Sequence, residues 1–284
     1  MDIRILRTIT EASDLAEEIV RSGRTLALVP TMGYLHQGHL SLMREGTRRA
    51  DVVVTSLFVN PTQFAASEDL SRYPRDEEGD FAKCESVGVS AAFAPHAGQM
   101  YPSHFETFVE VTGVSRGFCG DRRPGHFRGV ATVVTKLLCL FRPRVALFGE
   151  KDYQQLQVIR ALNRDLNLGV EIIGMPIVRE ADGLAMSSRN SYLSVDERKR
   201  ATALWRGLQR ARDLVRDGTR MAERIKAAVR HELDKGQVKE DYLEVVDAVT
   251  LQPLSLVPDA IPCRMLVAGF VGNNRLIDNI ALET

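Results

Sequence analysis

Short apolar runs alternate with amphipathic stretches over the N-terminal part of the chain. The runs are continuous and β-prone, which is typical of buried parallel strands, and the main ones span residues 26–29, 51–59, 145–148 and 170–178, with shorter ones at residues 91–93 and 108–111. Apolar positions with a helical period predict helices at residues 12–21, 76–86 and 126–141. Strands that alternate with helices predict an α/β fold with a Rossmann-like, doubly wound parallel sheet.

Charged helices replace this alternation towards the C-terminus. Residues 196–215 and 220–233 have helical patterns, and alternating apolar residues predict strands at residues 242–246 and 265–269. The change predicts two domains, in which residues 1–184 form the larger one and residues 185–284 form a smaller α+β lid domain.

The end of the first apolar run carries the most informative candidate chemistry. The run stops at Pro30 and Gly33, and a helical pattern then opens with His36 and His39. In an α/β sheet this point lies at the carboxyl end of a strand, where the unpaired N–H groups of a helix start and the positive end of its dipole favour phosphate. Two histidines on one face of a helical turn can bind one anion together, and Gly38 leaves room for a ligand close to the backbone.

Other interpretations of the histidine pair stay open on this pattern alone. His36 and His39 can serve only to cap or pack the helix. A zinc site is less favoured, because a zincin helix needs histidines four residues apart with a glutamate beside the first, and Gln37 stands there instead.

Amide and charged side chains follow two further predicted strands. Asn60 and Gln63 come directly after the second run in a loop that contains proline, so we expect them to face the same crevice, although an ordinary Asn-Pro turn is the alternative. Gly149, which permits an unusual backbone turn, and Lys151, a mobile positive charge suited to phosphate oxygens, follow the third run.

The next candidates along the chain are polar side chains near helix starts and in a loop. Asp152 stands where it can cap the following helix, and Gln155 lies one turn into that helix. A loop after the fourth run then presents two hydroxyls and a guanidinium, which together suit a polyphosphate: Ser187, Ser188 and Arg189. Ser-Ser-Arg is common in loops, so this group carries weight only together with the other candidates.

Composition excludes several classes of protein. The 284 residues contain 37 Lys and Arg against 37 Asp and Glu, so no global positive field attracts nucleic acid or anionic membrane. The 4 cysteines form no CxxC pair and predict neither a disulfide framework nor a zinc ribbon. With no apolar run long enough to span a bilayer, we expect a soluble, cytoplasmic protein without membrane or nucleic-acid partners. The absence of GxG and Gly-Lys sequences disfavours dinucleotide cofactors and P-loop chemistry.

The ordered set of motifs resembles the pantothenate synthetase (pantoate–β-alanine ligase) family. The matching segments are residues 30–40, 58–64, 149–155 and 186–190, with residues 275–279 near the end, so the resemblance covers nearly the whole chain. Several ordered motifs are far more specific than any one alone. The family belongs to the HxGH nucleotidyltransferase superfamily, which is related in fold to class I aminoacyl-tRNA synthetases.

This resemblance implies a site for ATP, pantoate and β-alanine. The residues implied to bind ATP are Met32, Gly33, Tyr34, Leu35, His36, Gln37, Gly38, His39, Gly149, Glu150, Lys151, Asp152, Val178, Met186, Ser187, Ser188 and Arg189. The catalytic residues implied among them are His36, His39 and Lys151. Gln63 and Gln155 are implied to bind pantoate, and Gln63 also β-alanine.

The implied reaction is the ATP-dependent condensation of (R)-pantoate with β-alanine through a pantoyl adenylate, which yields pantothenate, AMP and pyrophosphate. The resemblance also implies Mg²⁺ on the ATP phosphates, no metal held by the protein alone, and a homodimer. Phosphoryl transfer of this type depends mainly on positioning and charge neutralisation, which these residue types supply.

Rival functions remain at this stage. A nucleotidyltransferase that makes a dinucleotide would share the histidine pair but has no evident use for Gln63 and Gln155. A class I synthetase or another RNA-binding protein would need a basic face and an added recognition domain, against which the balanced charge argues. A nucleotide-binding module without activity is the third alternative, and exchange of pyrophosphate into ATP separates it from the enzymes.

Overall fold

The computed structural model describes residues 3–65 and 70–282 and consists of two units. Unit 1 contains the described residues up to Glu150 together with Gln154–Pro176, and unit 2 contains Lys151–Tyr153 and the described residues from Ile177 onward. This division differs from a boundary at residue 184, because residues 151–153 and 177–184 group with the C-terminal unit. Hydrogen bonds to the C-terminal strands, described below, account for that grouping.

Unit 1 is built on a six-stranded, wholly parallel sheet with the order β1-β4-β3-β2-β5-β6. Its strands are β1 (Arg4–Leu6), β2 (Leu26–Thr31), β3 (Val52–Leu57), β4 (Ala91–Phe93), β5 (Val145–Gly149) and β6 (Glu171–Met175). All but β1 coincide with the predicted apolar runs, and the short edge strand β1 was not predicted. Both faces of such a sheet are covered, which explains why the central runs are continuously apolar instead of alternating. The predicted doubly wound parallel sheet is confirmed.

The strand order reverses between β2 and β5. The chain proceeds from β2 outward through β3 to β4, then returns to the other side of β2 to form β5 and β6, and Ala27 of β2 pairs with Val145 of β5. Ligands of doubly wound sheets bind outside the carboxyl ends of the strands at such a reversal. The turn that follows β2 therefore lies at the position where a ligand is expected.

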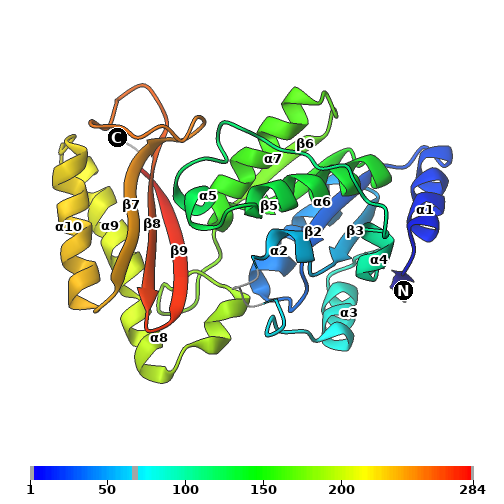
Figure 1. Ribbon diagram of the computed structural model, residues 1–284, viewed down its shortest axis with the longest axis horizontal. Helices are drawn as coiled ribbons and strands as arrows, with labels where there is room; N and C mark the ends of the chain where they lie inside the picture. Colours follow the sequence, from blue (N-terminus) through cyan, green and yellow to red (C-terminus); the bar gives the residue numbers. More distant parts are fainter. Residues whose placement is uncertain (1–2, 66–69, 283–284) are drawn as a thin grey trace. The chain divides into compact units, whose positions relative to one another are not determined.

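Helices cover both faces of this sheet, as Figure 1 shows. They are α1 (Ile9–Arg21), α2 (Gln37–Arg49), α3 (Glu77–Ser86), α4 (Ala97–Met100), α5 (Phe118–Arg122), α6 (His126–Phe141) and α7 (Tyr153–Asp165), with 3₁₀ turns η1 (Pro61–Gln63) and η2 (Glu150–Asp152). Met43 of α2 and Cys84 of α3 pack with Val29 of β2 in one buried apolar cluster, while α6 packs against α1. The predicted helices at residues 12–21, 76–86 and 126–141 agree with α1, α3 and α6 within a few residues.

One strand prediction is wrong. Residues 108–111 form an irregular segment, in which Val109 N–H donates to the Thr132 hydroxyl of α6 at 3.0 Å. The Phe108 ring lies against the Arg128 guanidinium, 4.2 Å from its centre. Within the described residues this segment pairs with no strand, so its apolar pattern serves packing on α6 and not a sheet.

Unit 2 contains a three-stranded antiparallel sheet of β7 (Lys239–Asp247), β8 (Cys263–Val271) and β9 (Asn274–Leu282) in the order β7-β8-β9. Its helices are α8 (Val195–Ala201), α9 (Ala203–Arg216) and α10 (Ala222–Lys235). The single helix predicted at residues 196–215 is thus divided at Thr202. Strand β9 was not among the predicted strands, because its apolar positions are interrupted by Asp278 and Asn279, whose buried side chains have specific partners.

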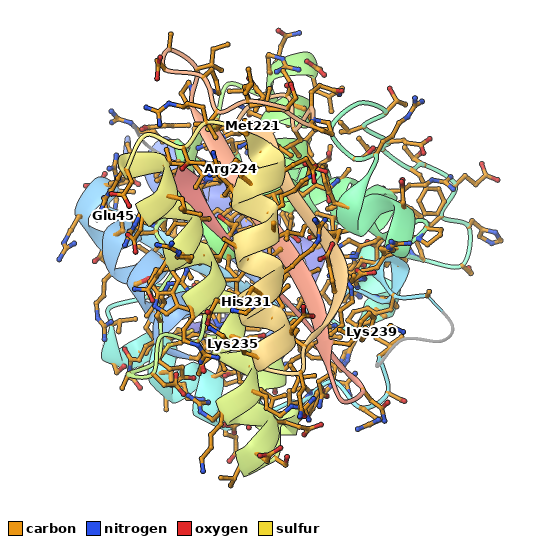
Figure 2. The ribbon with its side chains drawn as sticks, turned by 90° about the vertical axis from the view of Figure 1, so that its left-hand side faces the viewer. Glu45, Met221, Arg224, His231, Lys235 and Lys239 are labelled. Carbon is orange, nitrogen blue, oxygen red and sulfur yellow. The ribbon has the colours of Figure 1, made fainter. Side chains whose placement is uncertain are left out.

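Helix α10 shows why these segments pack as they do. Its buried side carries Ile225, Val229 and Leu233, which join the apolar cluster between the helices and the sheet. The opposite side is exposed, and Figure 2 shows Arg224 and His231 along it. Burial of one apolar side therefore fixes the helix on the sheet.

Candidate active site

The turn after β2 has an unusual backbone. Gly33 and Tyr34 both have positive φ, at 81° and 51°, so two consecutive residues adopt the left-handed region. A side chain in this region costs roughly 1–2 kcal/mol per residue. Such a turn persists only where surrounding contacts hold it, and it directs the chain into α2.

His36 and His39 form the N-terminal cap of α2. The His36 Nδ1 accepts the Gly38 N–H at 3.1 Å, and the His39 Nδ1 accepts the His36 N–H at 3.3 Å. These bonds form a reciprocal capping box, and the two rings lie with centroids 4.0 Å apart. The two histidines therefore cap the helix and lie together.

This arrangement fixes the protonation geometry of both rings. A neutral imidazole carries one proton, and a ring nitrogen that accepts a hydrogen bond cannot hold it. Because Nδ1 of each histidine accepts a backbone N–H, the neutral form of each ring has its proton on Nε2. Each ring can then donate from Nε2.

One N–H group that the sequence analysis expected to be unpaired at the helix start has a side-chain partner, that of Gly38. The N–H groups of Tyr34 and Leu35 donate to the Asp80 carboxylate, at 2.6 and 2.7 Å, and those of His36 and Gly38 donate to the histidine rings. Side-chain acceptors therefore bind these N–H groups at the point where the sequence analysis expected phosphate.

Asp80 was not among the sequence candidates. It lies on α3, and its side chain is buried with Oδ1 3.6 Å from the Lys83 ammonium. Burial raises the pKa of the Asp80 carboxyl, and the two backbone N–H bonds and Lys83 oppose that rise. A single acidic residue among the several acidic residues at the start of a predicted helix gives no signal of this role.

A buried hydrogen-bond network follows β3. Asn60 donates from Nδ2 to Gln63 Oε1 and to the Gly129 carbonyl, each at 3.1 Å, and its Oδ1 accepts the Tyr101 hydroxyl at 2.8 Å. Because Gln63 Oε1 is an acceptor here, its NH₂ group points the other way, and Nε2 lies 3.1 Å from the Met32 sulfur. The predicted residues Gln63 and Met32 are thus neighbours in unit 1.

The main chain of Gln63 is held by α6. His126 lies with Nδ1 2.9 Å from the Gln63 carbonyl and Nε2 3.0 Å from an Arg123 nitrogen. Arginine only donates, so Nε2 of His126 accepts and Nδ1 donates to the carbonyl. Gly129 allows this close approach, since a Cβ there would lie 2.4 Å from the Thr62 carbonyl oxygen. The apolar period of residues 126–141 predicts the helix but gives no signal of these two roles.

The two consecutive glutamines of α7 differ in environment. Gln154 is buried, accepts the Cys119 N–H at 3.0 Å and donates to carbonyls of the preceding loop, including that of Arg116 at 3.0 Å. Gln155, the predicted pantoate ligand, is only partly buried. The structure thus gives Gln154 a structural role that the sequence did not indicate.

Lys151 is held through its main chain in unit 2. Asn279 of β9 donates from Nδ2 to the Lys151 carbonyl at 3.1 Å. Nearby, Tyr153 donates its hydroxyl to the Ala248 carbonyl at 2.8 Å, and the Arg264 guanidinium lies 4.1 Å from the Tyr153 ring centre. These contacts explain why residues 151–153 belong to unit 2.

The remaining candidates around this segment are Gly149, Glu150 and Asp152. Gly149 is the last residue of β5 and does not have positive φ, so the unusual backbone turn expected there is absent. Glu150 and Asp152 lie in η2, directly before α7.

A short hairpin brings two further candidates together. Met186 N–H donates to the Val178 carbonyl at 3.0 Å, and Arg179 pairs with Ala185 in an isolated antiparallel bridge. Val178 and Met186, both implied to contact the nucleotide, are therefore adjacent in unit 2. Arg179, which follows Val178, makes a bidentate ion pair with the buried Asp278, with nitrogen–oxygen distances of 2.7 and 3.0 Å.

The serine and arginine candidates lie at the start of η3 (Ser188–Tyr192). Ser187 caps this turn by accepting the Arg189 N–H at 3.3 Å, and the Ser188 side chain is buried. Asn190 ties the turn to the hairpin by donating to the Ala185 carbonyl at 3.0 Å. The hydroxyl and guanidinium groups are therefore on a defined turn beside Met186.

The family model and the known relatives described here match nearly the whole chain and agree on one family. The family model described as pantoate-beta-alanine ligase matches residues 4–281. The chain belongs to the pantoate–β-alanine ligase family. A pantothenate synthetase of Myxococcus xanthus is 64% identical over 279 residues, which are 98% of this chain and 96% of the relative, and one of Thermotoga neapolitana is 50% identical over 99% of this chain and all of the relative.

Solved structures of the family agree with the fold. A pantothenate synthetase from Thermus thermophilus is 44% identical with a TM-score of 0.93, covering 99% of this chain and 100% of that one. A pantoate-beta-alanine ligase from Francisella tularensis, described as complexed with beta-gamma ATP and beta-alanine, is 31% identical with a TM-score of 0.82 over 99% of this chain and 98% of that one. The ligase family thus accounts for both the parallel sheet and the small antiparallel sheet.

Two general properties complete the description of this ligase family member. Within residues 3–65 and 70–282, no group of three His, Cys, Asp or Glu side chains is placed to hold a metal ion. Among the same described residues, no helix combines the length and the apolar character needed to cross a membrane.

Proposed function

We propose that this protein joins (R)-pantoate to β-alanine with consumption of ATP. A carboxylate oxygen of pantoate attacks the α-phosphorus of ATP, the bond from that phosphorus to the bridging oxygen breaks, and pyrophosphate leaves. The amine of β-alanine then attacks the acyl carbon of the pantoyl adenylate, the bond from acyl carbon to phosphate oxygen breaks, and AMP leaves with loss of one amine proton. The products are pantothenate, AMP and pyrophosphate.

The observation that carries this proposal is the pairing of Gln63 with Met32. Asn60 fixes the Gln63 amide so that its NH₂ group faces Met32, which lies in the turn leading to the histidine cap. A thioether sulfur is a weak acceptor, and a carboxylate is a much stronger partner for the same NH₂ group. An amide donor for the pantoate carboxylate therefore stands beside the motif proposed to bind ATP, within unit 1.

The ATP ligands proposed for unit 1 are the residues of the turn and cap, Met32 to His39. His36 and His39, with their protons on Nε2, would donate to phosphate oxygens and stabilise the charge that develops on departing pyrophosphate. Gln63 and Gln155 would bind pantoate, and Gln63 also β-alanine.

The ATP ligands proposed for unit 2 are Lys151, Asp152 and the residues of the hairpin and its following turn. Lys151 would neutralise negative charge at the α-phosphate, and Ser187, Ser188 and Arg189 would bind phosphate oxygens. Val178 and Met186, adjacent in the hairpin, would contact adenine. Gly149 and Glu150 are further proposed nucleotide ligands and belong to unit 1.

Mg²⁺ fits this reaction as a partner of the nucleotide. Magnesium in ATP-dependent enzymes is bound largely by substrate phosphates and water, with few protein ligands. Bound there, Mg²⁺ would neutralise phosphate charge. We further propose a cytoplasmic homodimer, in keeping with the family resemblance.

The test is pyrophosphate exchange. With Mg²⁺, ATP and pantoate, the protein should exchange labelled pyrophosphate into ATP without β-alanine, because adenylation precedes amide formation. The amide analogue of pantoate should support no exchange, since its carboxylate is the nucleophile.

Variants of two histidines sharpen this test. His39→Ala should depress exchange strongly, and His231→Ala, which removes an exposed imidazole from α10, serves as the matched control. Exchange that requires β-alanine, or that runs equally well with an amino acid or a mononucleotide in place of pantoate, would overturn the proposal in favour of another adenylating enzyme. No exchange at all would favour a nucleotide-binding module.

A further inference from the structure

Asp80 of α3 contacts the turn before the histidine cap from a distant part of the chain. Its two carboxylate oxygens accept one backbone N–H each, Oδ2 from Tyr34 at 2.6 Å and Oδ1 from Leu35 at 2.7 Å. Hydrogen bonds to an ionised acceptor are shorter and stronger than neutral ones. The Asp80 side chain is also buried, so water does not compete for these bonds.

These two bonds hold a backbone that is otherwise unfavourable. Tyr34 has φ of 51°, a conformation that L side chains adopt rarely, and Gly33 before it has φ of 81°. A Cβ on Gly33 would lie 3.0 Å from Asp80 Oδ2, so the carboxylate packs directly against the turn as well as bonding to it. Leu35 anchors the other end of the turn by packing in the same apolar cluster as Cys84 of α3.

The conformation of this turn determines where the histidine rings lie. His36 follows Leu35 directly and is the N-cap residue of α2, and its ring and that of His39 are fixed by bonds to the backbone of residues 36 and 38. A shift of the Gly33–Leu35 backbone would therefore move the cap and both Nε2 donors. Asp80 reaches this backbone from α3, more than forty residues further along the chain.

A carboxylate suits this task better than an amide. An asparagine at the same place could accept one N–H through its oxygen, but its NH₂ group would face the other N–H, donor against donor. The charge of Asp80 is balanced on its own helix by Lys83, whose ammonium lies 3.6 Å from Oδ1. A buried carboxylate with both oxygens bonded to backbone N–H groups constrains the geometry of that backbone.

We propose that Asp80 is a positioning residue for adenylation, which holds the Gly33–Leu35 turn so that the His36 and His39 rings keep their Nε2 donors in place for the ATP phosphates. This inference rests on the proposed function, because it takes the histidine cap as the phosphate-binding part of the site. Asp80 itself acts only through the turn.

The test compares Asp80→Asn with Glu78→Gln, which removes a carboxylate charge from an exposed position of the same helix. In pantoate-dependent pyrophosphate exchange, Asp80→Asn should lower kcat by about 10- to 100-fold, as expected for a small displacement of reacting groups, and should change the KM for pantoate by less than about twofold. Glu78→Gln should retain wild-type kcat. Thermal melting establishes that each variant is folded.

A spectroscopic measurement reads the same geometry without activity. Long-range ¹⁵N–¹H NMR spectra of the imidazole rings should show His36 and His39 of the unsubstituted protein protonated on Nε2, and Asp80→Asn should lose this single-tautomer pattern. Gly33→Ala perturbs the same turn independently and should give the same signature. The double variant should then be little worse than the more severe single one, because both changes act on one element.

The outcomes separate this inference from the function on which it rests. Absence of exchange in the unsubstituted protein overturns the function, while the ring spectra still decide whether Asp80 holds the cap. Wild-type kcat and unchanged spectra in Asp80→Asn would overturn the inference, as would a matching loss in Glu78→Gln. Parallel losses of ATP and pantoate affinity with intact spectra would show a structural role only, which also overturns it.

Discussion

Gly129→Ala is expected to displace the proposed pantoate-binding segment from its support. A Cβ at residue 129 would lie 2.4 Å from the Thr62 carbonyl oxygen and 2.7 Å from the Gln63 Cα, and both are backbone atoms that cannot rotate away. Carbon atoms pack favourably at roughly 3.5–4.0 Å, so η1 must move away from α6 by about 1 Å. That movement strains the bond from Asn60 to the Gly129 carbonyl.

The magnitude follows from two opposing terms. Overpacking of this kind costs about 1–3 kcal/mol, whereas replacing a helical glycine by alanine gains up to about 1 kcal/mol of helix propensity. We therefore expect a net destabilisation of about 1–2 kcal/mol. Because a misplacement of roughly 1 Å in a binding group can cost up to about 100-fold in activity, kcat/KM for pantoate should fall at least about tenfold.

The assay is urea denaturation together with pyrophosphate exchange titrated separately with pantoate and with ATP. Gly98→Ala is the matched control, because Gly98 lies exposed in α4, has ordinary φ and has no atom within 4 Å of the place that a methyl group would take. The control should be neutral or slightly stabilising. Unchanged stability and unchanged pantoate kinetics in Gly129→Ala would refute the argument that the close approach of α6 sets the position of Gln63.

Three further predictions concern charge, a buried ion pair and the thiols. Lys151→Ala should lower turnover at least about a hundredfold, comparable to the loss of an oxyanion donor, and near wild-type turnover in a folded variant would remove this residue from the mechanism. Arg179→Met should cost about 3–5 kcal/mol in urea denaturation by leaving the buried Asp278 unpaired, whereas adding Asp278→Leu should recover most of it. In the folded protein, Ellman's reagent should modify the exposed Cys139 and spare the buried Cys84 even at pH 9. Burial raises the pKa of the Cys84 thiol to about 12, so this thiol stays protonated at that pH. Rapid modification of Cys84 would contradict this prediction.

The parallel sheet could be predicted because its signal is local. A strand covered on both faces must be apolar at nearly every position, and the sequences of β2, β3 and β5 show this pattern. The ends of those strands could be predicted as well, since glycine, proline and amide side chains interrupt the runs. The same local rule produced the wrong strand at residues 108–111, where the apolar residues pack on a helix.

The supporting contacts of the site could not be predicted in this way. Asp80, His126 and Asn279 each act on a residue far away in sequence, and no spacing or periodicity joins the two partners. The pairing of the Gly38 N–H at the start of α2 was missed for a related reason, because an imidazole is an uncommon cap and the general rule for helix starts does not anticipate it.

These three contacts share one feature that bears on how the site works. Asp80 binds backbone N–H groups of the turn before His36, His126 binds the carbonyl of Gln63, and Asn279 binds the carbonyl of Lys151. In each case the supporting side chain holds the main chain, so the chemistry of the neighbouring candidate side chain is not altered by the contact. A substitution at a supporting position should therefore misplace an intact functional group, whereas a substitution at Lys151 removes the group itself. At a supporting position, any replacement that supplies the same donor or acceptor to the backbone group should preserve function, whereas at Lys151 only a replacement that keeps the proposed positive charge should do so.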